Sequence, residues 1–491
     1  MDAERTPVVI ASGQTLERDD YVTPLDLAER AASIALDAGD RGSGALRGRI
    51  ERVSVVNMLS PGGPSPASML ATRLGLRRAT RCETTTVGGN TPQWLVTRAA
   101  RDIAAGTLTG ATLIVGAETM RSARSQPTFP PAADGFTPDP VIGEDRPGIG
   151  PAETAVGVLA PAHVYPLFES VLAARSGRSF AEQRAFLGRL LAPFTEVAAK
   201  HPHAWFTEPR SAQELAEPSP SNRLVTEPYT KLMNAFLGGD QAAAIVVTSL
   251  AVARQLGVAD GAVFVWSGAD ASDVWFPSAR PDLGASPGIA AAGRAALDAA
   301  GVTVDDLAAF DLYSCFPSAV QMGAAALGVA LDDGRGLTVT GGLPYFGGPG
   351  NNYTTHAIAT MVDRLRTEPG AGLVTGLGWY VTKHSVGVYG TTPPPNGFAA
   401  GDTGDAQRAI DASALDVVVG EVLDADATVD ASTVIYTPAG DVQSAPVIAT
   451  LADGRRVVAT AAPTDGRAVE TENLVGRRVH VTGWPPTYKV V

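Results

Sequence analysis

The chain has 491 residues, of which 45% are hydrophobic and 18% charged, as in a globular protein with more than one domain. Its net charge of −13 argues against binding to nucleic acid or to an anionic membrane surface, because both require a basic protein face. Two cysteines are too few for a disulfide framework or a cysteine-rich zinc site. We therefore expect no nucleic-acid partner and no metal site.

The N-terminal sequence MDAERTPVVIASG has no basic segment followed by an apolar stretch, so no secretory signal peptide is expected. No run approaches the roughly 18 apolar residues that a membrane-spanning helix needs. These two features predict a cytoplasmic protein that does not insert into a membrane.

Six segments of the first 120 residues recur in the same order after roughly 255 to 260 residues. The clearest pairs are PVVIASG (Pro7–Gly13) with AVFVWSG (Ala262–Gly268), LAERAASIALDAG with AAAGRAALDAAG, and TTTVGGNTPQWLVTRAARDI with LPYFGGPGNNYTTHAIATMV. Each half alternates strands with helices, which predicts a mixed, largely parallel sheet covered on both faces. Two copies in one chain predict a pseudo-twofold axis, with a site where the halves meet.

Two further regions differ from the repeated halves. Residues 121–237 are rich in proline around one helical run, Phe180–Lys200, and an insertion of this length must be functional or a subdomain. Thr391–Gly404 has the composition of a linker, and short alternating strands follow it, with Asp453-Gly454 as a hairpin turn. The expected domains are 1–120 plus 238–255 (N-terminal half), 121–237 (loop domain), 256–395 (C-terminal half) and 405–491 (a small OB-like β-barrel).

The duplicated half, the insertion and the Gly-rich turns together resemble the thiolase superfamily. The sequence is most similar to the sterol-carrier-protein-type thiolases and the thiolase-like proteins of type 1, over about residues 5–395. GGDQAAAIVV (Gly238–Val247) resembles the family's strand that closes the first half. The resemblance implies an α/β fold of two mixed-sheet halves, layered αβαβα. It also implies acyl-CoA or a lipid as substrate or ligand, no covalently bound cofactor, and a homodimer.

The residues that carry thiolase chemistry are replaced. That chemistry needs a thiolate at a helix N-terminus, a base, and donors for two oxyanions. The family's stretch that opens with the nucleophilic cysteine reads GGNTPQW here, so Gly88 takes the place of the cysteine. The family's GHP motif lies within YFGGPGNNY, so Gly348 takes the place of the histidine. We therefore expect standard thiolase activity to be weak or absent.

A third motif supplies the candidate catalytic residues. The loop Tyr313-Ser314-Cys315-Phe316 resembles the family's NEAF or HDCF loop. Cys315 matches the acid/base cysteine of the sterol-carrier-type enzymes, and Tyr313 replaces the Asn or His that orients a catalytic water. Cys315 and Tyr313 are therefore the residues that the resemblance assigns to proton transfer.

The last family motif, a Cys-x-Gly turn, corresponds to LVTGLGWYVTKH, which has glycines and no cysteine. We expect Lys383 and His384, at its end, to lie at a solvated strand end. Cys82 falls six residues before Gly88 and is expected to be structural, inside the preceding strand. His356 is expected to be a packing or surface residue on a helix.

The glycines keep their places in the two Gly-rich turns, each of which precedes a helix. Backbone N–H groups there can hold a thioester oxygen, and nearby asparagines either add amide donors or cap the helices. The expected ligand-binding residues are Gly88, Gly89, Asn90, Gly347, Gly348, Asn351, Asn352 and Gly378.

Three functions remain open. The first is retro-aldol cleavage of a β-hydroxyacyl-CoA by Tyr313 together with Tyr345 or Tyr353, as in superfamily aldolases that lack the cysteine and pair with an OB-type domain. The second is a non-catalytic acyl-CoA or lipid carrier. The third is an acyltransferase in which another residue replaces the cysteine. In each, we expect the pantetheine of CoA at the junction of the halves and its nucleotide against the insertion.

Overall fold

The computed structural model describes residues 3–77, 80–125, 137–461 and 472–491. Within them one continuous sheet runs through both halves, in the order β10-β11-β12-β9-β1-β8-β4-β2-β3-β5, with β13 beside β9. Its strands are β1 (Pro7–Glu17), β2 (Ile50–Val55), β3 (Arg81–Thr85), β4 (Ala111–Thr119), β5 (Val141–Ile142), β8 (Asp240–Ser249), β9 (Val263–Ser272), β10 (Ala309–Asp311), β11 (Ala371–Gly378), β12 (Lys383–Gly390) and β13 (Ala399–Ala400).

The two halves repeat one strand order and are joined edge to edge. Read from the outer edge of the sheet inward, the first half ends with β2-β4-β8-β1, and the second half is β10-β11-β12-β9. Within each of these two sets of four strands, the strand that comes first in the sequence lies at the inner edge, beside the strand that comes last. These two inner strands pair antiparallel, Val8 with Phe264 and Val9 with Val263. This arrangement confirms the predicted duplication and makes the two mixed-sheet halves parts of a single sheet.

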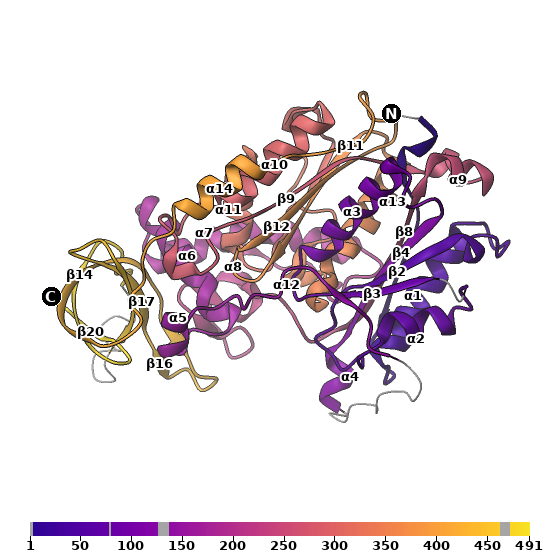
Figure 1. The fold of residues 1–491 in the computed structure, drawn as a ribbon. Coiled ribbons are helices and arrows are strands. Elements are labelled where there is room, and N and C mark those ends of the chain that lie inside the picture. The colour runs from indigo at the N-terminus through magenta and orange to yellow at the C-terminus, as the bar shows by residue number, and fades with distance from the viewer. Residues whose placement is uncertain (1–2, 78–79, 126–136, 462–471) are drawn as a thin grey trace.

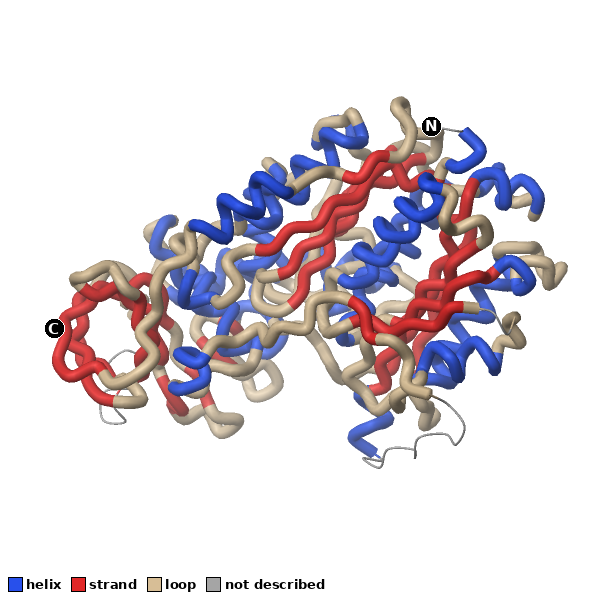
Figure 2. The backbone as a smooth tube through the Cα atoms, viewed as in Figure 1, coloured by secondary structure: helices blue, strands red, loops and turns tan. Residues whose placement is uncertain are grey.

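The helices complete the predicted αβαβα layering (Figure 1). The six layer helices are α1 (Pro24–Ala38), α2 (Pro66–Arg73), α3 (Thr91–Ala105), α10 (Pro287–Ala300), α11 (Pro317–Leu327) and α13 (Tyr353–Thr367). Helices α1 and α2 pack on the first half and α10 packs on the second, with α11 against α10. Helices α3 and α13 contact each other and both halves, so they form the shared middle layer between the two groups of strands in Figure 2.

Helix α3 approaches the second half closely because the strands beneath it carry glycine. Gly387 on β12 and Gly268 on β9 are direct cross-strand partners. A Cβ at Gly387 would lie 2.2 Å from Gln93 Nε2, and a Cβ at Gly268 would lie 2.2 Å from Thr97 Oγ1. Gln93 and Thr97 are one helical turn apart on the same face of α3. The hydroxyl of Tyr389 donates to Gln93 Oε1 at 2.6 Å, so the buried amide is paired.

The insertion leaves and re-enters the sheet at one place, because it connects β4 to its antiparallel neighbour β8. Its helix α7 occupies the predicted helical run, and α6 is a helix that the sequence did not indicate. The elements of this region are α4 (Met120–Ser125), α5 (Pro151–Ala155), α6 (Pro161–Arg175), α7 (Phe180–Lys200), α8 (Ala212–Ala216), β6 (Leu224–Thr226), β7 (Tyr229–Thr230) and, after β8, α9 (Leu250–Gln255).

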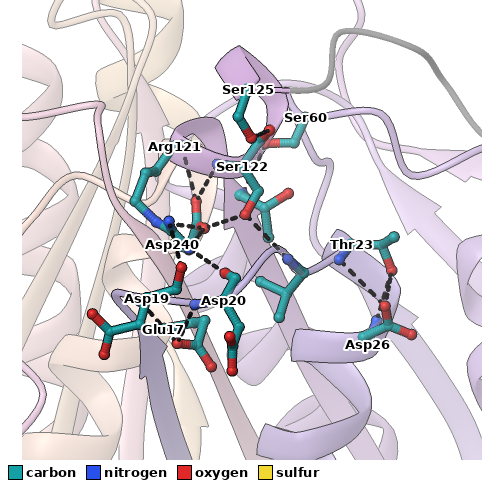
Figure 3. Close-up of polar contacts among 12 residues, drawn as sticks. Glu17, Asp19, Asp20, Thr23, Asp26, Ser60, Arg121, Ser122, Ser125 and Asp240 are labelled. Carbon is teal, nitrogen blue, oxygen red and sulfur yellow. Dashed lines mark hydrogen bonds and ion pairs between the residues drawn. The ribbon is translucent and has the colours of Figure 1, made fainter.

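The buried carboxylate of Asp240 fastens the two ends of the insertion together (Figure 3). It accepts hydrogen bonds from the backbone N–H groups of Arg121 and Ser122, from Arg121 Nε at 3.1 Å, and from Ser122 Oγ at 2.6 Å. The guanidinium of Arg121 also donates to the backbone carbonyls of Asp19 and Asp20. The insertion is thereby held against the end of β1.

The C-terminal region forms a closed barrel, in the order β14-β17-β18-β20-β19, at the end of the molecule remote from the first half (Figure 1). The predicted hairpin turn is confirmed, with Gly454 at φ +88° between β17 and β18. Strand β15 leaves the barrel and pairs with β6 of the insertion. The remaining elements are α12 (Gly342–Tyr345), α14 (Gly404–Ala412), β14 (Val422–Ser432), β15 (Ile435–Tyr436), β16 (Val442–Ser444), β17 (Pro446–Leu451), β18 (Arg456–Ala461), β19 (Arg478–Gly483) and β20 (Thr487–Val490).

The segment expected to be a linker does not extend freely between the two regions. Strand β13 pairs with β9, and α14, which begins at Gly404, packs on α10. Among the described residues no helix is long and apolar enough to cross a bilayer.

We expect Asp240→Ala to lower the free energy of unfolding by about 3 kcal/mol, because Arg121 and Ser122 lose a buried acceptor. Urea denaturation followed by circular dichroism measures this change. The control is Asp20→Ala, whose side chain is exposed at the same place, and it should be nearly neutral. Equal effects of the two substitutions would contradict the role of Asp240.

Candidate functional site

A cavity of about 870 Å³ opens where the two halves, the insertion and α14 meet. Its wall combines the N-terminus of α3, the loop after β5, the C-terminal end of β9 and the start of β12. The lining residues are Thr86, Asn90, Thr91, Trp94, Gly143, Glu144, Arg146, Asp270, Ala271, Ser272, Asp273, Val274, Trp275, Phe276, Ala279, Lys383, His384, Thr403, Gly404, Gln407, Asp411 and Ala414.

The side chain of Lys383 occupies the space beside Gly88. A Cβ at Gly88 would lie 2.9 Å from Lys383 Cε and 3.0 Å from Lys383 Nζ. Gly378 meets the same methylene, 3.0 Å from its own ideal Cβ. The structure therefore brings Gly88 and Gly378 together. The space between them is filled by Asn90, whose Oδ1 lies 2.5 Å from both ideal Cβ positions, and by the Lys383 side chain from β12.

Lys383 is buried, with 6% of its surface exposed, and its two acceptors are uncharged. Its Nζ donates to the backbone carbonyl of Val87 at 2.5 Å and to that of Glu144 at 3.4 Å. Burial lowers the pKa of Lys383 to about 8, against the opposing effect of Glu144 and Asp145. A substantial fraction of the amine is therefore neutral near physiological pH.

The expectation that Lys383 and His384 lie at a solvated strand end is wrong. Both are buried, because β12 is covered by α3 on one face and α10 on the other. His384 Nε2 lies 2.8 Å from Asp273 Oδ2 and 3.3 Å from Ser286 Oγ. Burial is the largest single influence on the pKa of Asp273 and raises it, but the hydrogen bonds from His384 and Ser286 and the charges of His384 and Arg280 together outweigh burial, and the pKa is lowered.

The Ser286, His384 and Asp273 cluster does not have the geometry of a nucleophilic triad. Ser286 Oγ donates to Asp273 and accepts from the backbone of Ile289, so it caps α10. The same ring nitrogen of His384 faces both partners, whereas a relay uses the two nitrogens separately. Ser286 is also absent from the cavity wall. The cluster therefore fixes His384 in the wall.

Three buried polar atoms of cavity-lining residues have no hydrogen-bond partner among the described residues. They are Thr86 Oγ1, Asn90 Oδ1 and Asp270 Oδ1. Burial raises the pKa of Asp270, which favours its neutral, proton-donating form. Buried polar groups are almost always paired, so we expect an ordered water molecule or a polar ligand to pair these three atoms.

The charges of the wall do not form a phosphate site. Four acidic residues line the cavity, and the lysine and arginine residues in its wall are Lys383 and Arg146. The acidic residues are Glu144, Asp270, Asp273 and Asp411. Arg146 lies at the exposed rim, with its guanidinium 4.1 Å from the centre of the Trp275 ring. The interior of the cavity therefore suits a neutral polar chain better than a nucleotide.

The asparagines in the Gly-rich turns hold the two halves together, and their side chains do not cap the helices. Asn351 Oδ1 accepts from the backbone N–H of Gly88 at 2.9 Å. Asn352 Nδ2 donates to the carbonyl of Gly116 at 2.6 Å, and Asn90 Nδ2 lies 3.4 Å from Ser385 Oγ. The N–H of Gly88, expected to face a thioester oxygen, is thus already bonded.

The second Gly-rich turn lies against the insertion. The N–H of Gly348 donates to the carbonyl of Phe236 at 2.8 Å. A Cβ at Gly347 would lie 2.2 Å from Gln241 Oε1, so that glycine is required by packing. Neither glycine lines the cavity.

Tyr313 and Cys315 are buried behind the cavity wall and are not among its lining residues. The hydroxyl of Tyr313 lies against Gly89, 2.2 Å from the ideal Cβ of that glycine. Tyr313 and His384 line a separate, small pocket between the second half and its outer helices. Burial raises the pKa of Tyr313 well above its usual value and that of the Cys315 thiol to about 12.

The remaining candidates pack in the interior. Tyr345 is buried, and its hydroxyl has no hydrogen-bond partner among the described residues. The hydroxyl of Tyr353 donates to Asp311 Oδ1 at 3.0 Å. His356 is buried and bonds Gln14 through Nδ1 at 2.8 Å, so it is a packing residue. Cys82 lies in β3, as predicted. In the described residues no group of three or more His, Cys, Asp or Glu is arranged to hold a metal ion.

No family model and no curated protein matches the chain. Among solved structures, a monomeric SCP2-thiolase-like protein type 1 from Mycobacterium smegmatis is 32% identical over 100% of both chains, with a TM-score of 0.86. An Ltp2–ChsH2(DUF35) aldolase is 18% identical over 79% of this chain and 98% of its own, with a TM-score of 0.61. The dimeric peroxisomal thiolase of Saccharomyces cerevisiae is 15% identical over 79% and 98%, with a TM-score of 0.58. The similarity of this chain to the aldolase and to the peroxisomal thiolase shows a shared fold and nothing more.

The contact between Gly88 and Lys383 predicts a coupling between these positions. Gly88 has φ +154°, and a side chain there meets Lys383, so Gly88→Ala should cost about 2 kcal/mol. Adding Lys383→Ala makes room and should recover about 1 kcal/mol of that loss. Urea denaturation of the two single variants and the double variant measures the coupling.

The matched control is Gly334→Ala, because Gly334 is exposed with open space around its ideal Cβ. Gly334→Ala combined with Lys383→Ala should be additive. Additivity at Gly88 as well would mean that Lys383 does not occupy the space beside it.

The lowered pKa of Lys383 predicts a pH-dependent stability. Its ordinary value is 10.5 and its value in the folded protein is about 8. Between these pH values the unfolded chain binds more protons, so the contribution of Lys383 to the free energy of unfolding rises with pH; below pH 8 its buried charge destabilises the fold. The free energy of unfolding of Lys383→Met, taken relative to that of the wild type, should therefore be higher at pH 7 than at pH 10. Chemical denaturation at both pH values tests this, with the exposed Lys200→Met as control; a pH-independent difference would contradict it.

Proposed function

The chain belongs to the family of SCP2-thiolase-like proteins of type 1, and from this premise we propose that it binds an acyl thioester in the cavity between its halves. No acyl-enzyme forms through a cysteine, because Gly88 stands at the nucleophile's place. The fold is that of a thiolase-like, acyl-CoA-related protein. Acyl-CoA is the ligand that we propose for it.

The observation that carries the proposal is the group of unpartnered polar atoms at one cavity. Thr86 Oγ1 supplies a hydroxyl donor, and Asp270 supplies a carboxyl group whose pKa is raised. Asn90 Oδ1 supplies an acceptor. A pantetheine arm and a thioester offer amide N–H groups and carbonyl oxygens in a neutral chain, which match such a wall.

The charge distribution suggests how CoA enters. The cavity volume is within the range of roughly 300–1,000 Å³ typical of small-molecule sites, so it suits the acyl and pantetheine parts. Its carboxylates would repel the phosphates. We propose that the nucleotide stays outside, beside Arg146 and Trp275, where the insertion borders the cavity. Among the expected ligand-binding residues, Asn90 lines this cavity, and Gly88 and Gly378 lie behind Lys383.

A carrier or binding role accounts for these features better than thiolase catalysis. Tyr313 and Cys315, the residues assigned to proton transfer by resemblance, are separated from the cavity wall, and a thiol of pKa about 12 is a poor base at neutral pH. Retro-aldol cleavage by Tyr313 remains the alternative, because its hydroxyl adjoins Gly89 at the same Gly-rich turn. A homodimer and a cytoplasmic location stay predictions.

We expect acetyl-CoA and acetoacetyl-CoA to bind with micromolar to millimolar dissociation constants, measured by titration calorimetry, and thiolysis of acetoacetyl-CoA to be absent. Thr86→Val should weaken binding by about 1–3 kcal/mol, because it removes the donor with little change in volume. The matched control is Thr107→Val, at an exposed position remote from the cavity.

Two outcomes would contradict the proposal. No heat of binding at millimolar ligand would exclude an acyl-CoA site. Turnover at roughly 1–1,000 per second in the thiolysis assay would mean that another residue serves as the nucleophile. Release of acetyl-CoA or propionyl-CoA from β-hydroxyacyl-CoAs, lost in Tyr313→Phe with binding retained, would favour the aldolase alternative.

A further inference from the structure

We propose that Lys383 is a reactive amine that forms an imine with the carbonyl carbon of an aldehyde or ketone held in the cavity. This inference does not depend on CoA binding, because a small carbonyl compound needs only access to the cavity. The covalent reaction would take place beside Gly88, where the resemblance places the cysteine of thiolases.

The hydrogen bonds of Lys383 match a neutral amine. An ammonium group has three N–H donors, whereas a neutral amine has two and a lone pair. Nζ has two acceptors, the backbone carbonyls of Val87 and Glu144. Both neutral N–H groups are thus used and the lone pair remains for an electrophile.

The surroundings also favour the neutral form. Both acceptors are uncharged carbonyls, and burial is the largest influence on the Lys383 pKa, with Glu144 and Asp145 the facing charged groups. His384 follows on β12 but points to the opposite face of the strand, toward α10. A lysine nucleophile is activated in this way, by desolvation.

A proton donor lies on the same face of the sheet. Lys383 is paired with Ser272, and Asp270 is two residues farther along β9, so Lys383 and Asp270 are diagonal neighbours, typically about 7–8 Å apart. Asp270 has an unpaired oxygen and a raised pKa, and both residues line the cavity. A carbonyl compound bound between them contacts the amine and the acid together.

The reaction balances without any other reactant. The amine lone pair attacks the carbonyl carbon, and one of the two nitrogen protons passes to the oxygen to give a neutral carbinolamine. Asp270 donates a proton to the hydroxyl, which leaves as water while the C=N bond forms. Loss of the nitrogen proton to the carboxylate of Asp270 restores the acid. The net change is amine plus carbonyl to imine plus water.

The sequence makes the test selective, because the chain has four lysines. Lys200, Lys231 and Lys489 are exposed, and Lys383 alone among the four is buried. At pH 7 an amine of pKa about 8 has a neutral fraction about 200-fold larger than one of ordinary pKa near 10.4. The contrast between Lys383 and the other three is therefore internal to one protein.

The experiment treats the full chain with butanal and sodium cyanoborohydride at pH 7 and follows butylation of each lysine by peptide mass spectrometry. We expect Lys383 to be modified about 100-fold faster than the three exposed lysines. Lys383→Arg and Lys383→Met should both abolish the fast modification, whereas Lys200→Arg should leave it unchanged. Asp270→Asn should slow it by about 100-fold, the lower range for a general acid.

Two results would overturn the inference. Modification of Lys383 no faster than that of Lys200 would show that the amine is protonated or inaccessible. Fast modification that persists in both Lys383 variants would locate it elsewhere. Circular dichroism spectra and urea denaturation of each variant establish that it is folded before its labelling is compared, and an unchanged rate in Asp270→Asn would remove Asp270 from the step.

Discussion

The close approach of α3 to the second half of the sheet is the constraint on which the site depends. Gly387 and Gly268 lie directly under Gln93 and Thr97, at distances that leave no room for a Cβ. The halves meet in turn because β1 and β9 pair at their inner edges. One helix therefore carries residues of the first half into contact with strands of the second, and its N-terminus ends at the cavity.

The same approach explains the chemistry at the site. Where α3 begins, Gly88 has no side chain, and β12 sends Lys383 into the space from the opposite half. The amine is thereby withdrawn from water and given two carbonyl acceptors, which lowers its pKa. The glycine at position 88 thus leaves space in which the Lys383 amine lies. The proposals of acyl thioester binding and of imine formation use one cavity, and they differ in whether Lys383 only fills space or also reacts.

The insertion and α14 complete the cavity surroundings. Asp240 closes the base of the insertion, which then supplies Glu144 and Arg146 to one wall. The barrel is tied to the insertion through β15 and β6, and α14 brings Gln407 to the opposite wall. The segments added to the duplicated core therefore shape the opening and supply much of its charge.

The sequence alone determined the duplication, the αβαβα class and the barrel, because each follows from local patterns. The loss of the catalytic cysteine and histidine, inferred from Gly88 and Gly348 at the family's motifs, stays a prediction. The role of Lys383 and His384 was misjudged, since a basic residue at a strand end is usually solvated, and only packing of α3 and α10 on both faces of β12 buries them. The bonded N–H of Gly88 depends on Asn351, 263 residues away. Asp270 and Thr86 carry no motif. Each is distinguished by one side-chain oxygen that has no partner among the described residues and by its place in the wall of a shared cavity, which are properties of the tertiary structure.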